Sequence, residues 1–191
     1  MRGIMVNNIY PDLSEDHPTY IEAPNTSGGI HGTLIQYIKR HYQPGDSLLL
    51  AGENENVIPI FRYYLPELGT IDNLGYSGDR DCEYFDLNLI RGFTPTYNIC
   101  FSQAVLEHVC MPNNVIQNLA DYTLEDGYIV LHTHNQCRPY HPYPIDCLRF
   151  FMDFFVDLQN YLPIVLIEYR EWSWAQEIAD HIGVLYKKIA Q

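Results

Sequence analysis

Two stretches decide the fold, NICFSQAVLEHVCMP (residues 98–112) and DGYIVLHTHNQCRPYHPYPIDCLRFF (residues 126–151), and one helix-like segment separates them. Each contains a short apolar run, residues 99–104 in the first and 128–133 in the second, which is typical of a buried strand. The order strand, helix, strand predicts two parallel strands joined by a crossover helix. Because ligands bind beyond the carboxyl ends of such strands, the polar residues after each run are the first candidates for a functional site.

The same alternation extends to both sides of these stretches. Helices are expected at residues 29–42, 57–64, 112–122, 146–158 and 173–182, and strands also at residues 47–51, 69–76, 164–169 and 183–189. This order predicts an α/β fold with a doubly wound, mostly parallel sheet of seven strands. Residues 28–191 are expected to form a single domain. Residues 1–27, which contain three prolines, are expected to form an irregular arm, either wrapped on the surface or placed as a lid over the ligand site.

The composition limits the partners of the chain. It has 191 residues and a net charge of −13, with 24 acidic and 11 basic residues, and a protein that binds a phosphate backbone normally carries a basic face. No nucleic-acid partner is therefore expected. No apolar run reaches a membrane-spanning length, and five cysteines without a CxxC pair are typical of a reduced, cytoplasmic protein. The sequence leaves the oligomeric state open, a homodimer included.

The quoted stretches resemble the small "type 11" class I methyltransferases, which depend on S-adenosyl-L-methionine (SAM). The resemblance rests on Ser102 followed by VLEHV, on the Asp126–Gly127 pair, and on the pattern HxxPxDxxRF over residues 141–150. It extends from Gly45 onward. The resemblance implies a Rossmann-like seven-stranded sheet, SAM as the cofactor and methyl transfer as the reaction.

The resemblance also implies where SAM binds. The residues expected to contact it at the carboxyl edge of the sheet are Gly52, Glu53, Asn54, Asp86, Leu87, Ser102, Gln103 and His108. The family has a glycine-rich loop at this place, but the sequence here is GENEN (residues 52–56), in which only Gly52 matches. Asn54 and Asn56 stand where later glycines are usual, and asparagine tolerates left-handed backbone well enough to keep the turn.

The second quoted stretch supplies the candidate catalytic residues. His141 is the candidate general base, because the pKa of histidine lies near neutrality, and Asp146 is expected to orient it. His134, Tyr140, Tyr143 and Arg149 are expected to bind the acceptor. In the alternative interpretation, Asp146 and Arg149 form only an ion pair that anchors the following helix.

No metal is expected from the sequence. His132 and His134 alternate on a strand and share one face, but together with Cys137 and His141 they match no tight zinc spacing.

The predicted function is SAM-dependent O-methyl transfer to a hydroxyl of a small or sugar-like (glycan) acceptor. Sixteen tyrosines and eight phenylalanines could line a saccharide site. The alternative is a methyltransferase-like domain that has lost cofactor binding and serves as a binding or scaffolding module. The glycine-poor turn at residues 52–56 favours this alternative, and the retained VLEHV and HxxPxDxxRF elements favour the enzyme.

Overall fold

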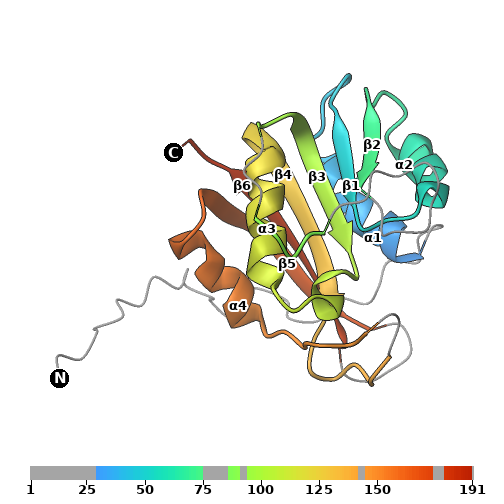
Figure 1. The fold of residues 1–191 in the computed structure, drawn as a ribbon. Coiled ribbons are helices and arrows are strands. Elements are labelled where there is room, and N and C mark those ends of the chain that lie inside the picture. The colour runs from blue at the N-terminus through green and yellow to red at the C-terminus, as the bar shows by residue number, and fades with distance from the viewer. Residues whose placement is uncertain (1–28, 75–85, 91–93, 142–144, 174–178, 191) are drawn as a thin grey trace.

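A computed structural model describes residues 29–74, 86–90, 94–141, 145–173 and 179–190 (Figure 1). The strands of the sheet are β1 (Leu48–Ala51), β2 (Ile71–Leu74), β3 (Tyr97–Gln103), β4 (Thr123–His134), β5 (Ile164–Trp172) and β6 (His181–Lys188). The α-helices are α1 (Gly29–Lys39), α2 (Ile58–Tyr64), α3 (Pro112–Tyr122) and α4 (Met152–Asp157), and the short 3₁₀ helices are η1 (Glu55–Val57), η2 (Leu106–His108) and η3 (Leu158–Asn160). The expected arm, residues 1–27, lies outside the described residues.

The sheet is doubly wound, as the sequence predicts. Its strand order is β2-β1-β3-β4-β6-β5, and the pairs from β2 to β4 are all parallel. Strand β6 is antiparallel to both of its neighbours, β4 and β5. Among the described residues the sheet has six strands, one fewer than predicted. The chain order reverses at β1, because β2 lies on one side of it and β3 on the other, and such a switch point is where open α/β sheets bind ligands.

Both faces of the sheet are covered, which explains why its central strands carry apolar residues on both faces. Leu49, Cys100 and Ile129 point into a core that also contains side chains of α3 and α4. The alternate residues of the same strands, such as Leu48 and Val130, point into a second core with side chains of α1 and α2. In Figure 1, α3 and α4 accordingly lie over one face of the sheet. Within the described part of the chain, no helix has the length and apolar character to cross a membrane.

One predicted helix is wrong in its first half. Residues 146–151 are not helical, and α4 begins only at Met152. The backbone N–H groups of Cys147 and Phe150 donate instead to the carbonyl oxygens of Glu107 (2.7 Å) and His134 (3.2 Å). These long-range bonds hold the segment as an extended chain against η2 and β4, which local apolar periodicity does not reveal.

The helix predicted at residues 173–182 is also corrected. Residues 174–178 lie outside the described residues, Ser173 and residues 179–180 are not helical, and His181 and Ile182 begin β6. Strand pairing explains the difference, because His181 pairs with His134 on one side and with Trp172 on the other.

Candidate functional site

The turn after β1 lies at the switch point and requires glycine at its first position. Gly52 has a φ of +78°, and a Cβ atom there would lie 2.3 Å from Cγ2 of Val105. Both the left-handed backbone and the lack of space therefore exclude a larger residue. Val105 follows β3 and covers the turn directly.

Asn54 keeps this turn in a different way from the one expected. Its backbone is extended, with φ −90° and ψ 144°, and its side chain accepts a hydrogen bond from the backbone N–H of Asn56 at 2.9 Å. Asn54 thus acts as the N-cap of η1 rather than as a left-handed substitute for glycine. The chain passes from Gly52 into a 3₁₀ turn within three residues.

Four buried polar atoms around this turn have no hydrogen-bond partner among the described residues. They are Glu53 Oε1, Asn73 Oδ1, Ser102 Oγ and Gln103 Oε1. We call these four residues together with Gly52 the switch-point cluster. Unsatisfied buried groups each cost about 1–3 kcal/mol, and every one of these atoms can accept a hydrogen bond. A ligand that carries N–H and O–H donors would satisfy them.

Two hydrogen-bonded contacts, one with His31 and one with Asn73, hold Glu53 in the switch-point cluster. Glu53 Oε2 lies 3.0 Å from His31 Nε2, and the carbonyl oxygen of Glu53 accepts a bond of 2.9 Å from Asn73 Nδ2. Asn73 was not predicted as a site residue.

The Asp86–Leu87 pair, also predicted to contact SAM, is anchored by its neighbour Asn88. Asp86 Oδ1 accepts two bonds of 3.0 Å from the backbone and side-chain nitrogens of Asn88. Asn88 Oδ1 in turn accepts from the backbone N–H groups of Cys110 and Met111, each at 3.1 Å. The Leu87 side chain belongs to the core, so only its backbone remains for a ligand.

Glu107 organises the other half of the sheet edge. Its side chain is fully buried, Oε1 lies 2.7 Å from His134 Nδ1, and Oε2 accepts a bond of 2.7 Å from Thr133 Oγ1. Burial raises the pKa of a carboxyl, but the hydrogen bonds from His134 and Thr133 outweigh burial and hold the pKa of Glu107 below its usual value. Glu107 is therefore held as a carboxylate that orients its neighbours.

Five histidine rings gather around Glu107, and we call His108, His132, His134, His141 and His181 the histidine cluster. The His134 ring centroid lies 4.9 to 5.4 Å from those of His132, His141 and His181. His132 Nε2 lies 3.0 Å from His181 Nδ1. Burial lowers the pKa of His132 well below its usual value and the pKa of His181 to about 4, so both rings are neutral at pH 7.

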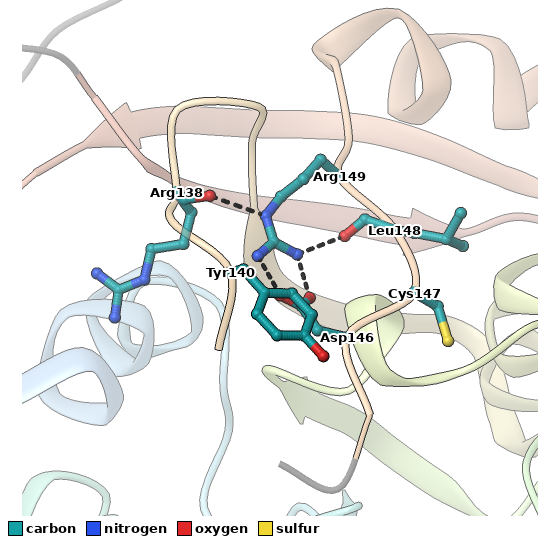
Figure 2. A pocket seen from close by; sticks show the side chains of 6 residues that line it. All are labelled: Arg138, Tyr140, Asp146, Cys147, Leu148 and Arg149. Carbon is teal, nitrogen blue, oxygen red and sulfur yellow. Dashed lines mark hydrogen bonds and ion pairs between the residues drawn. The ribbon is translucent and has the colours of Figure 1, made fainter. Parts of the chain in front are cut away.

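Arg149 fixes the loop that follows β4. Its guanidinium donates to both carboxylate oxygens of Asp146 and to the carbonyl oxygens of Arg138 (3.1 Å), Pro139 (3.0 Å) and Leu148 (2.7 Å). Figure 2 shows this guanidinium between the Arg138 and Leu148 carbonyls, on the wall of a pocket of about 280 Å³. The hydrogen bonds from Arg149 hold the pKa of Asp146 well below its usual range. The ion pair of the alternative interpretation thus exists, although it anchors an extended segment instead of a helix.

His141 lies between the two carboxylates. Its Nδ1 is 3.5 Å from Asp146 Oδ2, its backbone N–H donates to the same oxygen at 2.8 Å, and its Nε2 is 3.9 Å from Glu107 Oε1. Burial, followed by the nearby His134 ring, lowers the pKa of His141 although both carboxylates raise it. A neutral imidazole that is 32% exposed has the protonation state and the access that a general base requires.

The remaining predicted residues are placed as follows. His108 Nδ1 contacts the carbonyl oxygen of Ile145, and its ring lies 5.0 Å from that of His141, so it belongs with the candidate base. His134 is buried and engaged by Glu107, Tyr140 is 72% exposed beside the pocket, and Tyr143 lies outside the described residues. Their roles stay predictions. His181, 49 residues from its partner His132, carried no sequence signal that joined it to this site.

Comparison with known proteins identifies the fold. No protein-family profile matches the chain, and no curated protein matches its sequence. Solved structures do match. The 1,6-didemethyltoxoflavin-N1-methyltransferase of Burkholderia thailandensis, determined with 1,6-didemethyltoxoflavin and S-adenosylhomocysteine bound, has a TM-score of 0.66 at 8% identity, over 82% of this chain and 77% of that chain.

Two further structures agree. The N-methyltransferase NodS of Bradyrhizobium japonicum WM9 has a TM-score of 0.61 at 8% identity, over 84% of this chain and 94% of that chain. A SAM-dependent methyltransferase of Aquifex aeolicus has a TM-score of 0.57 at 13% identity, over 82% of this chain and 89% of that chain. The protein therefore has the fold of the SAM-dependent class I methyltransferases.

Proposed function

We propose that this protein is a SAM-dependent methyltransferase that binds SAM at the switch-point cluster. The observation that carries the proposal is the set of unsatisfied acceptors at the carboxyl edge of a methyltransferase fold. SAM has an ammonium group, ribose hydroxyls and an adenine amino group, all of which donate hydrogen bonds. The acceptors Glu53 Oε1, Asn73 Oδ1 and Gln103 Oε1 fit these donors, and Gly52 presents no side chain to a ligand.

The proposed acceptor is a hydroxyl of a small or sugar-like molecule. SAM supplies an activated methyl group, and a hydroxyl that receives it must lose its proton. His141 is neutral, partly exposed and held by Asp146, and it is the base that takes this proton. The exposed ring of Tyr140 can stack on a sugar ring beside the pocket.

The loop after β4 gives this acceptor site its rigidity. Arg149 holds Asp146 and three backbone carbonyls at once, so the loop loses little entropy when an acceptor binds. The proposal retains a single domain over residues 28–191 with an N-terminal arm, a cytoplasmic location and no nucleic-acid partner.

Calorimetry with S-adenosylhomocysteine, the demethylated product, tests the cofactor site directly. We expect saturable binding, together with a higher melting temperature, because a ligand selective for the folded state stabilises it. Gly52→Ala should weaken binding. Gly45→Ala is the matched control, because Gly45 also has a positive φ (+90°) but no atom within 4 Å of a Cβ there. No heat and no thermal shift at millimolar ligand would exclude the cofactor site.

The second candidate function is a methyltransferase-like binding or scaffolding module without cofactor. The packing of Val105 directly against Gly52 and the early start of η1 favour it, because both occupy space beside the turn. The two candidates differ in the same titration. If the protein is such a module, it should not respond to S-adenosylhomocysteine. In that case Val105→Ala should create affinity for S-adenosylhomocysteine only if the Val105 side chain alone blocks the site.

A further inference from the structure

We propose that His132, His134 and His181 bind a divalent transition metal ion of the zinc class. One ring nitrogen of each lies within 4.8 Å of those of the other two, and all three residues are buried. The site lies on β4 and β6 and uses none of the residues of the switch-point cluster. The inference therefore stands or falls independently of the proposed SAM site.

The sheet itself brings the three rings together. His132 and His134 alternate on β4 and so share one face of the sheet. In the antiparallel pairing of β4 with β6, His181 lies directly opposite His134, and Gly183 lies opposite His132. Backbone hydrogen bonds between strands thus fix the positions of all three ligands, which is the rigid support that a metal site requires.

Two buried carboxylates stand behind the rings. Glu107 Oε1 lies 2.7 Å from His134 Nδ1, and Asp180 Oδ1 lies 3.5 Å from His181 Nε2. Metal-binding histidines almost always donate their second ring N–H to a carboxylate, a carbonyl or water, which fixes the tautomer. This leaves His134 Nε2, His181 Nδ1 and His132 Nε2 for the ion.

An ion would replace the hydrogen bond between His132 Nε2 and His181 Nδ1 with two ligand bonds, and it would leave the contacts of the rings with the two carboxylates in place. Asp180 Oδ1 is buried and forms no hydrogen bond with the described residues at the observed geometry. When an ion occupies His181 Nδ1, the ring proton must sit on Nε2, which faces this oxygen. The same rule places the His134 proton on Nδ1, which faces Glu107. His132 Nδ1 is buried and has no hydrogen-bond partner among the described residues, with or without an ion.

Distance and charge both suit a small dication. Zinc–nitrogen bonds of about 2.0–2.1 Å in a tetrahedral site place ligand nitrogens about 3.3 Å apart. The His132–His181 pair at 3.0 Å needs only a slight opening, and the nitrogens of all three rings already lie within 4.8 Å of one another. Asp180 Oδ2 is paired with Arg138 at 2.9 Å, so the neutral rings, Glu107, Asp180 and Arg138 sum to one negative charge, which an ion would offset.

A competing ligand set is Glu107, His134 and His141. In that set the ion would have to displace the proton between Glu107 and His134, and Thr133 already donates to the other carboxylate oxygen. The three-histidine set keeps both of these bonds. The two sets share only His134, because the first also needs His132 and His181 and the second also needs Glu107 and His141.

The test measures metal in the full chain. The protein is stripped with a chelator and titrated with Zn²⁺ by calorimetry, and with Co²⁺ by visible absorption, which reports tetrahedral nitrogen ligands. We expect one equivalent to bind. His181→Gln should weaken Zn²⁺ binding at least 100-fold, and Asp180→Asn about 10- to 100-fold, while His141→Ala should leave it unchanged.

Two controls exclude other sites. His41→Gln removes a histidine that stacks on Tyr128, away from the cluster, and should change nothing. The double variant Cys110→Ser, Cys147→Ser removes two sulfurs that lie 3.9 Å apart and could bind zinc themselves. No stoichiometric binding to the wild-type chain would overturn the proposal, as would loss of binding in the cysteine variant or the His141 variant. If His181→Gln does not fold, the proposal is still tested by the Zn²⁺ stoichiometry of the wild-type chain and by the Zn²⁺ affinity of the Asp180→Asn variant.

Discussion

The switch-point cluster and the histidine cluster lie at the same edge of one sheet and are satisfied to very different degrees. Around Gly52, four buried polar atoms lack partners among the described residues. One strand away, Glu107 has donors on both carboxylate oxygens and on its carbonyl. The difference indicates that the hydrogen bonds of Glu107 are complete within the protein, whereas the acceptors around Gly52 are left open, as the proposed SAM site requires.

The largest effect is expected on the preorganised side. His141→Ala removes the candidate base and should lower turnover by roughly 10²–10⁴-fold, measured with SAM and a panel of small and sugar hydroxyl acceptors. The melting temperature and the affinity for S-adenosylhomocysteine should stay near the wild-type values. A lower melting temperature with intact activity of the folded fraction would make His141 a structural residue.

A comparison of two glutamates measures the difference in hydrogen bonding directly. Glu107→Ala leaves His134 and Thr133 without their shared buried acceptor and should reduce the free energy of unfolding by about 3–5 kcal/mol. Glu53→Ala should cost less, because His31 is the only hydrogen-bond partner of its carboxylate within the described part of the chain. Urea unfolding of both variants measures which one loses more free energy of unfolding. Equal losses would mean that the hydrogen bonds of Glu107 and Glu53 contribute equally to stability.

The switch-point side can be tested through its packing. Gly52→Ala puts a Cβ into left-handed backbone and against Val105, which should reduce stability by about 2–4 kcal/mol. In a Val105→Ala background the clash is gone and only the backbone strain remains. A double-mutant cycle should therefore show coupling between the two positions. Additive effects would show that the backbone alone requires glycine.

The smallest effect concerns pH. Arg149 lowers the pKa of Asp146 in the folded chain, so this carboxylate stabilises the fold above its unfolded pKa of about 3.9 and loses that contribution as the pH falls. Asp146→Asn should cost about 1.5 kcal/mol at pH 7 and progressively less below pH 4. Unfolding measured across this range tests the sign, and a difference that grows on acidification would contradict it.

Local pattern was sufficient for much of the fold. The helix at residues 112–122 is found with the predicted bounds, because proline starts it and Val115 and Leu119 mark its buried stripe. The helix predicted from residue 146 was wrong because residues 146–151 have the composition of a helix. Their backbone instead bonds to Glu107 and His134, and the Arg149 side chain donates to carbonyl oxygens that lie ten and eleven residues away in the sequence.

The site was predictable only where its residues are neighbours in sequence. His141, Asp146 and Arg149 lie in one short pattern and do meet in the structure. His181 was missed because it meets His134 only through the antiparallel pairing of β6 with β4. The spacing of residues in the sequence does not indicate that pairing. The prediction that no metal binds rested only on the spacing of histidines and cysteines in the sequence. The pairing of β4 with β6 adds His181 to His132 and His134, and the proposal of a metal site rests on that pairing.

The position of β6 between β4 and β5 has a consequence for how the protein is made. A ribosome releases β5 before β6, yet among the described strands β5 pairs only with β6, so β5 has no such partner until residues 181–188 emerge. Strands β2, β1, β3 and β4 pair with one another and can assemble earlier. During synthesis the exposed edge of β4, with His132 and His134, therefore waits for β6, and the three-histidine site is completed in the same step that closes the sheet.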